Sequence, residues 1–390
     1  MAFKIKAFAI SFGITTALCV VFMLATCGRN GNDIPYTDVV FEAQQPLAMA
    51  QEQISLTPLE DNLLEEVYDE EYYEEEYIEL APVSVLTGMP INEEYITRRP
   101  FAVVINNIRR ALPQSGIASA DIIYEALAEG DVTRFVAIFQ SYVPNKIGPV
   151  RSTRDYFVDF ALNHDSIFVH HGGSDSGYAR VRNTGIPALD GMALEGSVFW
   201  RDRAYPSWSF NTGTRPLEHS SYTGWQRIYP HIASRDIRDY MRDDISYGFL
   251  FGDIPEGIEN LGEANSVSVP FVAGDVRTFV FDPEHGHYLV QNRDGAHVDE
   301  LNREQVVVSN ILVQLVPIRV VDGVGRRNIY TVGEGSGYLI RDGTYFAVNW
   351  AKSSHTSPMR WYFEDGSPII LTPGSTWICV FQSTGTVGFE

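Results

Sequence analysis

The sequence predicts an α/β (α+β) N-terminal domain followed by a smaller, mostly antiparallel β C-terminal domain. The first half of the folded body contains near-continuous apolar runs separated by a helical pattern, which is typical of strands covered on both faces. The second half changes to short β-rich runs broken by Asp-Gly turn pairs. With 390 residues, 45% hydrophobic and 12% aromatic, the chain is long enough to bury a large core.

The chain begins with the layout of an export signal, residues 1–27. Lys4 and Lys6 precede an uncharged run that ends in Leu24-Ala25-Thr26-Cys27. A Leu three residues before the Cys fits a lipoprotein processing site, although Thr26 replaces the usual Gly, Ala or Ser. We therefore expect cleavage and lipidation at Cys27; the alternative is an uncleaved membrane anchor, since about 20 apolar residues cross a bilayer. Both place the body on the extracytoplasmic face of the cell membrane.

Residues 28–82 form an acidic segment that we expect to be a disordered tether. The segment carries much of the net charge of −21, and its like charges repel one another. Four tyrosines at near-helical spacing offer a docking stripe as the alternative to a plain spacer: Tyr68, Tyr72, Tyr73 and Tyr77. The acidic balance excludes nucleic acid as an expected partner, because phosphate binding needs clustered Lys and Arg.

The N-terminal domain is expected over residues 83–260. Its strands are predicted from three apolar runs: Phe101 to Asn106, Thr133 to Tyr142 and Ser166 to His171. Between the last two, residues 152–163 repeat aromatics at helical spacing, with Ser152 and Asp155 as a capping box. A second amphipathic helix is predicted to start at Ser234.

Two motifs in this domain suggest chemistry. Arg151, Ser152 and Arg154 fall at the predicted loop-to-helix junction, where free N–H groups and the helix dipole favour an anion. Their guanidinium groups suit a carboxylate or phosphate, unless one of them pairs with an internal acid such as Glu125 or Glu129.

The second motif is HHGGSDSG, residues 170–177, where a Gly-rich turn leaves a strand end. Open α/β sheets bind ligands at such ends, although the dinucleotide spacing is absent. Adjacent strand residues face opposite ways, so we expect one of His170 and His171 in the core and the other at a site.

The C-terminal domain is expected over residues 265–390. Six β-rich runs predict an antiparallel sandwich or barrel: 276–282, 288–292, 305–316, 337–341, 345–350 and 377–381. Its tryptophans are expected in the core, in preference to a ligand platform. His297, Trp350 and Lys352 are candidates for a surface site.

The chain resembles the YerB-like lipoprotein family of Gram-positive bacteria from about Val85 to the C-terminus. The resemblance lies in PQSGIASADIIYE (113–125), IGPVRSTRDYF (147–157), the HGGS turn (171–174) and several residues of the second domain. It implies a membrane lipoprotein with paired N- and C-terminal domains, uncharacterised function and no assigned catalytic residue. The chain departs from the family pattern at Asp131, usually Gly, and at Ser220, where the pattern has Asn after His219.

Two functions follow as competing hypotheses. The first is a binding lipoprotein that recognises an anionic cell-wall polymer or an envelope protein. Its ligand-binding residues would be Glu125, Arg134, Arg151, Ser152, Arg154, His171, Arg201 and His219. The second is an envelope hydrolase or transferase that uses Glu125 or Glu129 with His171 or His219. A purely structural spacer does not explain two folded domains. No metal and no cofactor are expected, because the chain has no H-E-x-x-H, G-x-S-x-G or P-loop motif.

Overall fold

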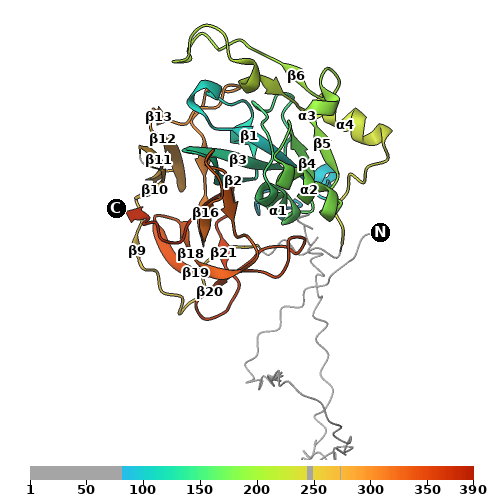
Figure 1. Cartoon of the computed structure of the whole chain (residues 1–390). Coiled ribbons are helices and arrows are strands. Elements are labelled where there is room, and N and C mark those ends of the chain that lie inside the picture. Colours follow the sequence, from blue (N-terminus) through green and yellow to red (C-terminus); the bar gives the residue numbers. More distant parts are fainter. Residues whose placement is uncertain (1–80, 244–248, 273) are drawn as a thin grey trace, which may run out of the picture. The chain divides into compact units, whose positions relative to one another are not determined.

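The computed structural model describes residues 81–243, 249–272 and 274–390 (Figure 1). The predicted signal with Cys27 and nearly all of the predicted tether lie outside the described residues. Within the described part, no helix is both long and apolar enough to cross a membrane.

An 11-stranded mixed sheet forms the centre of the fold, with the strand order β20-β19-β18-β15-β22-β2-β3-β1-β4-β5 and β9 paired to β19 (Figure 1). The first half of the body contributes β1 (Phe101–Asn106), β2 (Ile122–Glu129), β3 (Val132–Phe139), β4 (Ile167–His170) and β5 (Ala188–Asp190). The second half contributes β9 (Gly262–Glu263), β15 (Asn310–Val316), β18 (Gly333–Arg341), β19 (Thr344–Lys352), β20 (Arg360–Phe363) and β22 (Thr376–Gln382).

The strand β22 joins the two halves of the body. It pairs in parallel with β15 on one side and with β2 on the other. Because this strand comes from the end of the chain, residues that are far apart in sequence share one sheet.

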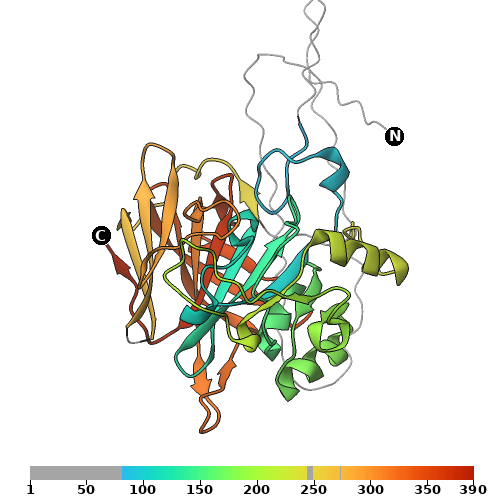
Figure 2. The ribbon, with the colours of Figure 1, turned by 90° about the horizontal axis from the view of Figure 1, so that it is seen from above.

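A six-stranded antiparallel sheet lies beside the central one, in the order β13-β12-β11-β10-β23 with β14 paired to β12 (Figures 1 and 2). Its strands are β10 (Ser266–Val272), β11 (Asp275–Asp282), β12 (His287–Asn292), β13 (Gly295–Ala296), β14 (Val307–Val308) and β23 (Gly388–Phe389).

The central sheet is buried on both faces, which explains the continuous apolar runs. On β1, Val103 and Ile105 pack toward Phe279 of β11, whereas Ala102 and Val104 belong to the cluster that contains Phe160 of α1. The latter face is covered by α1 (Asp155–Leu162) and α2 (Asp175–Thr184), which contact each other. Every residue of β1 is buried, as expected for a strand with two covered faces.

Short elements complete the fold. The helices are α3 (Gly191–Leu194) and α4 (Trp225–Ser234), with 3-10 turns η1 (Glu93–Tyr95), η2 (Arg109–Ala111), η3 (Ile117–Ser119) and η4 (Leu217–His219). Three two-stranded pairs are formed by β6 (Trp200–Arg201) with β7 (Ser221–Tyr222), β8 (Leu250–Phe251) with β21 (Ile370–Leu371), and β16 (Ile318–Val320) with β17 (Arg327–Ile329).

These elements confirm the predicted fold class, an α/β first half followed by a mostly antiparallel β region. The helix predicted to start at Ser234 is wrong, because α4 ends there. The following residues instead run beside the chain near Thr97: Met241 donates its backbone N–H to Thr97, and Asp236 has a positive φ. The capping box is also wrong, since Arg154 is the N-cap of α1 and the Ser152 hydroxyl bonds to the His171 carbonyl.

Candidate functional site

The segment that carries Arg151 lies against the strands β1 and β4 as an extended chain. The Arg151 N–H donates to the Val104 carbonyl at 2.9 Å, and the Arg151 carbonyl accepts from the His171 N–H at 3.0 Å. Farther along, the Thr153 N–H donates to the Gly172 carbonyl at 2.9 Å. In an extended chain successive side chains point to opposite faces, so the arginines of this segment do not share one side.

A pocket of about 320 Å³ opens where this segment meets the ends of the parallel strands β1, β4 and β5. Four of the predicted site residues line it together: Arg151, Ser152, His171 and Arg201. The remaining lining residues are Val150, Gly172, Met192, Leu217 and Glu218. We call this the Arg151 pocket. Its position at the carboxyl ends of strands is where open α/β sheets bind ligands.

Arg151 is the cation of the pocket that lacks a carboxylate partner. One of its terminal nitrogens donates to the Glu218 backbone carbonyl at 2.6 Å. No carboxylate of the described residues forms an ion pair with it. Burial lowers the pKa of Arg151, and the charges of Glu129 and Glu218 oppose this shift. An arginine remains protonated under such conditions, so a positive charge faces the pocket.

Arg201, by contrast, is neutralised within the pocket wall. Its guanidinium binds both oxygens of Glu195, at 2.6 and 2.8 Å, and donates to the Leu217 carbonyl at 2.8 Å. It also donates to His171 Nε2 at 3.0 Å. Because Nε2 accepts this bond, Nδ1 carries the ring proton and donates to the Ser221 hydroxyl at 2.7 Å.

The His171 ring is held neutral and in one place. Burial, and next the charge of Arg201, lower the pKa of His171. The ring packs edge-on against Phe199, with centroids 5.8 Å apart. On its other side it lies so close to Gly191 that a Cβ there would fall 2.2 Å from Nδ1. The glycine at position 191 is therefore required by the position of the histidine.

His219 lies beside the pocket and does not line it. Its Nδ1 accepts from the Asn106 side-chain amide at 2.9 Å, at the end of β1. Burial, followed by the charge of Arg151, lowers the pKa of His219. It is the last residue of η4, whose Leu217 and Glu218 line the pocket.

Arg134 and Arg154 belong to a separate cluster around Glu129. Both guanidinium groups bind the Glu129 carboxylate, one on each oxygen. Arg134 also donates to the Ser152 carbonyl at 2.7 Å. Glu129 thus pairs with two arginines, and these contacts hold the segment that contains Arg151 in place.

Glu125 lies in the interior, away from the Arg151 pocket. Arg277 grips both of its oxygens, at 2.9 and 3.1 Å. Thr133 and the Trp377 indole donate to the same carboxylate, at 2.8 and 3.2 Å. This network joins β2, β11 and β22, and Glu125 is only 1% exposed.

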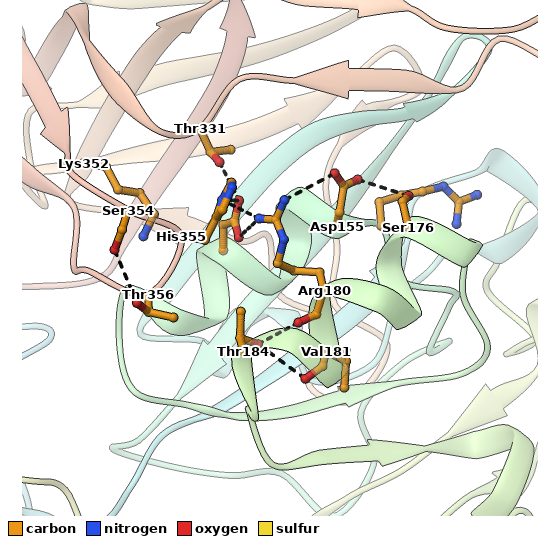
Figure 3. Close-up of polar contacts among 12 residues, drawn as sticks. Asp155, Ser176, Arg180, Val181, Thr184, Thr331, Lys352, Ser354, His355 and Thr356 are labelled. Carbon is orange, nitrogen blue, oxygen red and sulfur yellow. Dashed lines mark hydrogen bonds and ion pairs between the residues drawn. The ribbon is translucent and has the colours of Figure 1, made fainter.

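A second polar cluster was missed by the sequence reasoning (Figure 3). Asp159 of α1 binds Arg180 of α2 and accepts from Thr331 at 2.6 Å and His355 at 3.0 Å. The sequence did contain one sign of this cluster, because Asp159 is an acid on the apolar face of the predicted helix. Its partners come from the second half, which the local pattern does not contain. The cluster ties α1 to the loop that follows β19.

Lys352 lies next to that cluster and is buried, as are Trp350 and His297. The expectation that these three residues form a surface site is therefore wrong. The Lys352 ammonium donates to the Asn163 side chain at 2.7 Å and to the Ser357 carbonyl. Burial lowers the pKa of Lys352 to about 8.

The arrangement favours binding over general acid–base chemistry. Neither Glu125 nor Glu129 hydrogen-bonds to a histidine within the described part of the chain. Ser221 accepts from His171, so the imidazole does not take a proton from this hydroxyl. The positive charge of Arg151 faces the pocket, and no carboxylate of the described residues forms an ion pair with it.

Comparisons with known proteins match two family models, described as the N-terminal and the C-terminal domain of a protein of unknown function (DUF3048). They match residues 86–238 and 267–378. The putative lipoprotein YerB of Bacillus subtilis (strain 168) is 33% identical over 298 residues, covering 75% of this chain and 84% of the relative. The crystal structure of Bacillus subtilis YerB superposes with a TM-score of 0.66 at 31% identity, over 79% of this chain and 99% of that chain.

Proposed function

Because this chain belongs to the DUF3048 family, we propose that it is a lipid-anchored protein of the outer face of the cell membrane that binds an anionic envelope ligand in the Arg151 pocket. The proposal that the protein binds an anionic ligand rests on the Arg151 guanidinium. It faces a pocket at strand ends, and no carboxylate of the described residues pairs with it.

The chemistry of the pocket suits a phosphate or carboxylate group. A guanidinium donates through a planar fork that matches both groups. Glu218 also lines the pocket, and its carboxylate forms no ion pair with Arg151. Glu195 is already held by Arg201. Phosphate-bearing cell-wall polymer is the partner that we favour, and an envelope protein that presents acidic side chains is the second.

The binding half is tested with the full chain purified in detergent. Inorganic phosphate is titrated by calorimetry, and retention on purified cell-wall polymer is measured by co-sedimentation. We expect Arg151→Ala to weaken both by about 10- to 100-fold, since a hydrogen bond to a charged group contributes about 1.5–3 kcal/mol. Arg151→Lys keeps the charge and loses the fork, so it should fall between the two.

Arg182→Ala is the control, because this exposed arginine lies in the last turn of α2 and does not line the pocket. Binding by this variant should stay near wild type. If Arg151→Ala binds phosphate and polymer as well as wild type does, the pocket is not the binding site. Loss of binding to an envelope protein alone would select the second partner.

The anchoring half rests on Cys27, which follows Leu24-Ala25-Thr26 at the end of an apolar run. A relative that is 33% identical is named a putative lipoprotein. We expect the wild-type chain to incorporate labelled palmitate and to fractionate with membranes, and Cys27→Ser to lose the label. A wild-type chain that stays in the membrane without label would show an uncleaved apolar anchor.

A further inference from the structure

The turn between β11 and β12 brings three metal-ligating side chains together. Asp282 ends β11, His287 begins β12, and the two are direct partners in the ladder. His285 lies in the turn between them, and its ring stacks on that of His287 with centroids 5.5 Å apart. The ligand atoms of the three side chains all lie within 4.8 Å of one another.

The separations between these atoms fit one small ion. His285 Nδ1 lies 2.9 Å from Asp282 Oδ2, and His287 Nε2 lies 3.8 Å from the same oxygen. Tetrahedral Zn²⁺ bonds to nitrogen and oxygen at about 2.0–2.1 Å, which places neighbouring ligand atoms about 3.3 Å apart. The two measured separations lie on either side of that value, so small side-chain rotations would complete the geometry.

The turn itself orients the carboxylate. Asp282 Oδ1 accepts from the Glu284 N–H at 3.0 Å, which leaves Oδ2 directed at the two histidines. The Gly286 N–H donates to the Asp282 carbonyl at 2.8 Å and closes the turn. His285 is 60% exposed at its side chain, so an ion reaches the cluster from solvent.

We propose that Asp282, His285 and His287 bind one divalent transition-metal ion of the Zn²⁺ type. Two imidazole nitrogens and one carboxylate oxygen favour Zn²⁺, Co²⁺, Ni²⁺ and Cu²⁺ over the oxygen-seeking Mg²⁺ and Ca²⁺. The ion replaces the proton that His285 Nδ1 shares with Asp282, and water completes the coordination. The site is on the six-stranded sheet, so it does not depend on the function proposed for the Arg151 pocket.

The test uses the full chain in detergent, with Zn²⁺ titrated by calorimetry and Co²⁺ followed by its visible absorption. Excess Mg²⁺ is present to occupy carboxylate-only sites in the acidic segment. We expect one saturable Zn²⁺ site and a Co²⁺ spectrum with nitrogen ligation. His285→Ala, His287→Ala and Asp282→Asn should each weaken Zn²⁺ binding at least tenfold, as expected on removing one of three ligands.

His231→Ala is the control, because His231 lies in α4, outside the cluster. It should bind Zn²⁺ like the wild type. Circular dichroism and thermal unfolding without metal establish that the hairpin variants are folded. The proposal is overturned if the wild type shows no saturable Zn²⁺ binding, or if folded hairpin variants bind Zn²⁺ as tightly as the wild type does.

Discussion

Two arginines of this protein, Arg277 and Arg151, occupy opposite kinds of environment. Arg277 is buried and donates hydrogen bonds to Glu125, to the Gln291 carbonyl and to the ring of His297. Arg151 donates to one backbone carbonyl and faces an open pocket. The first charge is paired inside the protein, and the second faces a pocket without a carboxylate partner among the described residues.

Partners and exposure separate a structural charge from a charge available to a ligand. A buried pair is costly to break, because removing one partner leaves the other charged and desolvated. Removing a half-exposed cation that has no carboxylate partner should lower the free energy of unfolding only slightly. Its donors remain available to a ligand. Stability and binding should therefore respond in opposite ways at the two positions.

Replacing the buried arginine should change the free energy of unfolding most. Arg277→Ala leaves Glu125 without its cation in the interior and should lower the free energy of unfolding by about 3–5 kcal/mol. Urea unfolding followed by tryptophan fluorescence measures it. Arg151→Ala, measured in parallel, should cost less than about 1 kcal/mol, since it breaks no ion pair. Equal losses of unfolding free energy in the two variants would contradict this difference between the two arginines.

A somewhat smaller effect is expected on the free energy of unfolding at low pH, through a buried histidine. His164 is buried beside Tyr124, whose hydroxyl lies 2.8 Å from Nε2. Burial, and next Lys352, lower the pKa of His164 from 6.5 to about 3. Between these values the unfolded chain binds the proton and the folded chain does not, so stability falls as the pH falls through this window. The loss attributable to His164 should reach about 3 kcal/mol at pH 4.

Urea unfolding at pH 7 and pH 4 tests this expectation. His164→Gln removes the titrating group, so its stability should depend less steeply on pH than that of the wild type, whatever its stability at pH 7. Parallel pH dependences in the two proteins would show that other groups control acid unfolding.

Much of the fold was predictable because its strands are covered on both faces. The run from Phe101 to Asn106 is apolar throughout and becomes β1 with the predicted bounds. The turn pairs Asp342-Gly343 and Asp365-Gly366 also lie where the chain reverses. The pairing of β22 with β2 was not predictable, because apolar runs specify burial and not their neighbours. The helix expected at Ser234 did not form, because a few apolar residues at helical spacing do not distinguish a helix from a chain held by long-range hydrogen bonds.

The convergence of the candidate residues on one pocket was only partly predictable. Arg151, Ser152, His171 and Arg201 converge on one pocket. Arg154 and Arg134 turn to Glu129, because an extended segment alternates its side chains and Glu129 is a neighbour only in the folded chain. Glu125 was singled out as a candidate general acid or base, and in the structure it is buried in an ion pair with Arg277. Such assignments depend on contacts between distant parts of the chain, which spacing does not contain.

The position of β22 has a consequence for how the molecule is made. The indole of Trp377 on this strand reaches Glu125, 252 residues earlier in the chain. Until those residues leave the ribosome, the edges of β2 and β15 that they will cover have no partner. Unpaired strand edges promote aggregation, and contacts of such long range form slowly. A chain truncated before residue 376 would lose the strand that joins its halves, which should make it a ready substrate for proteases.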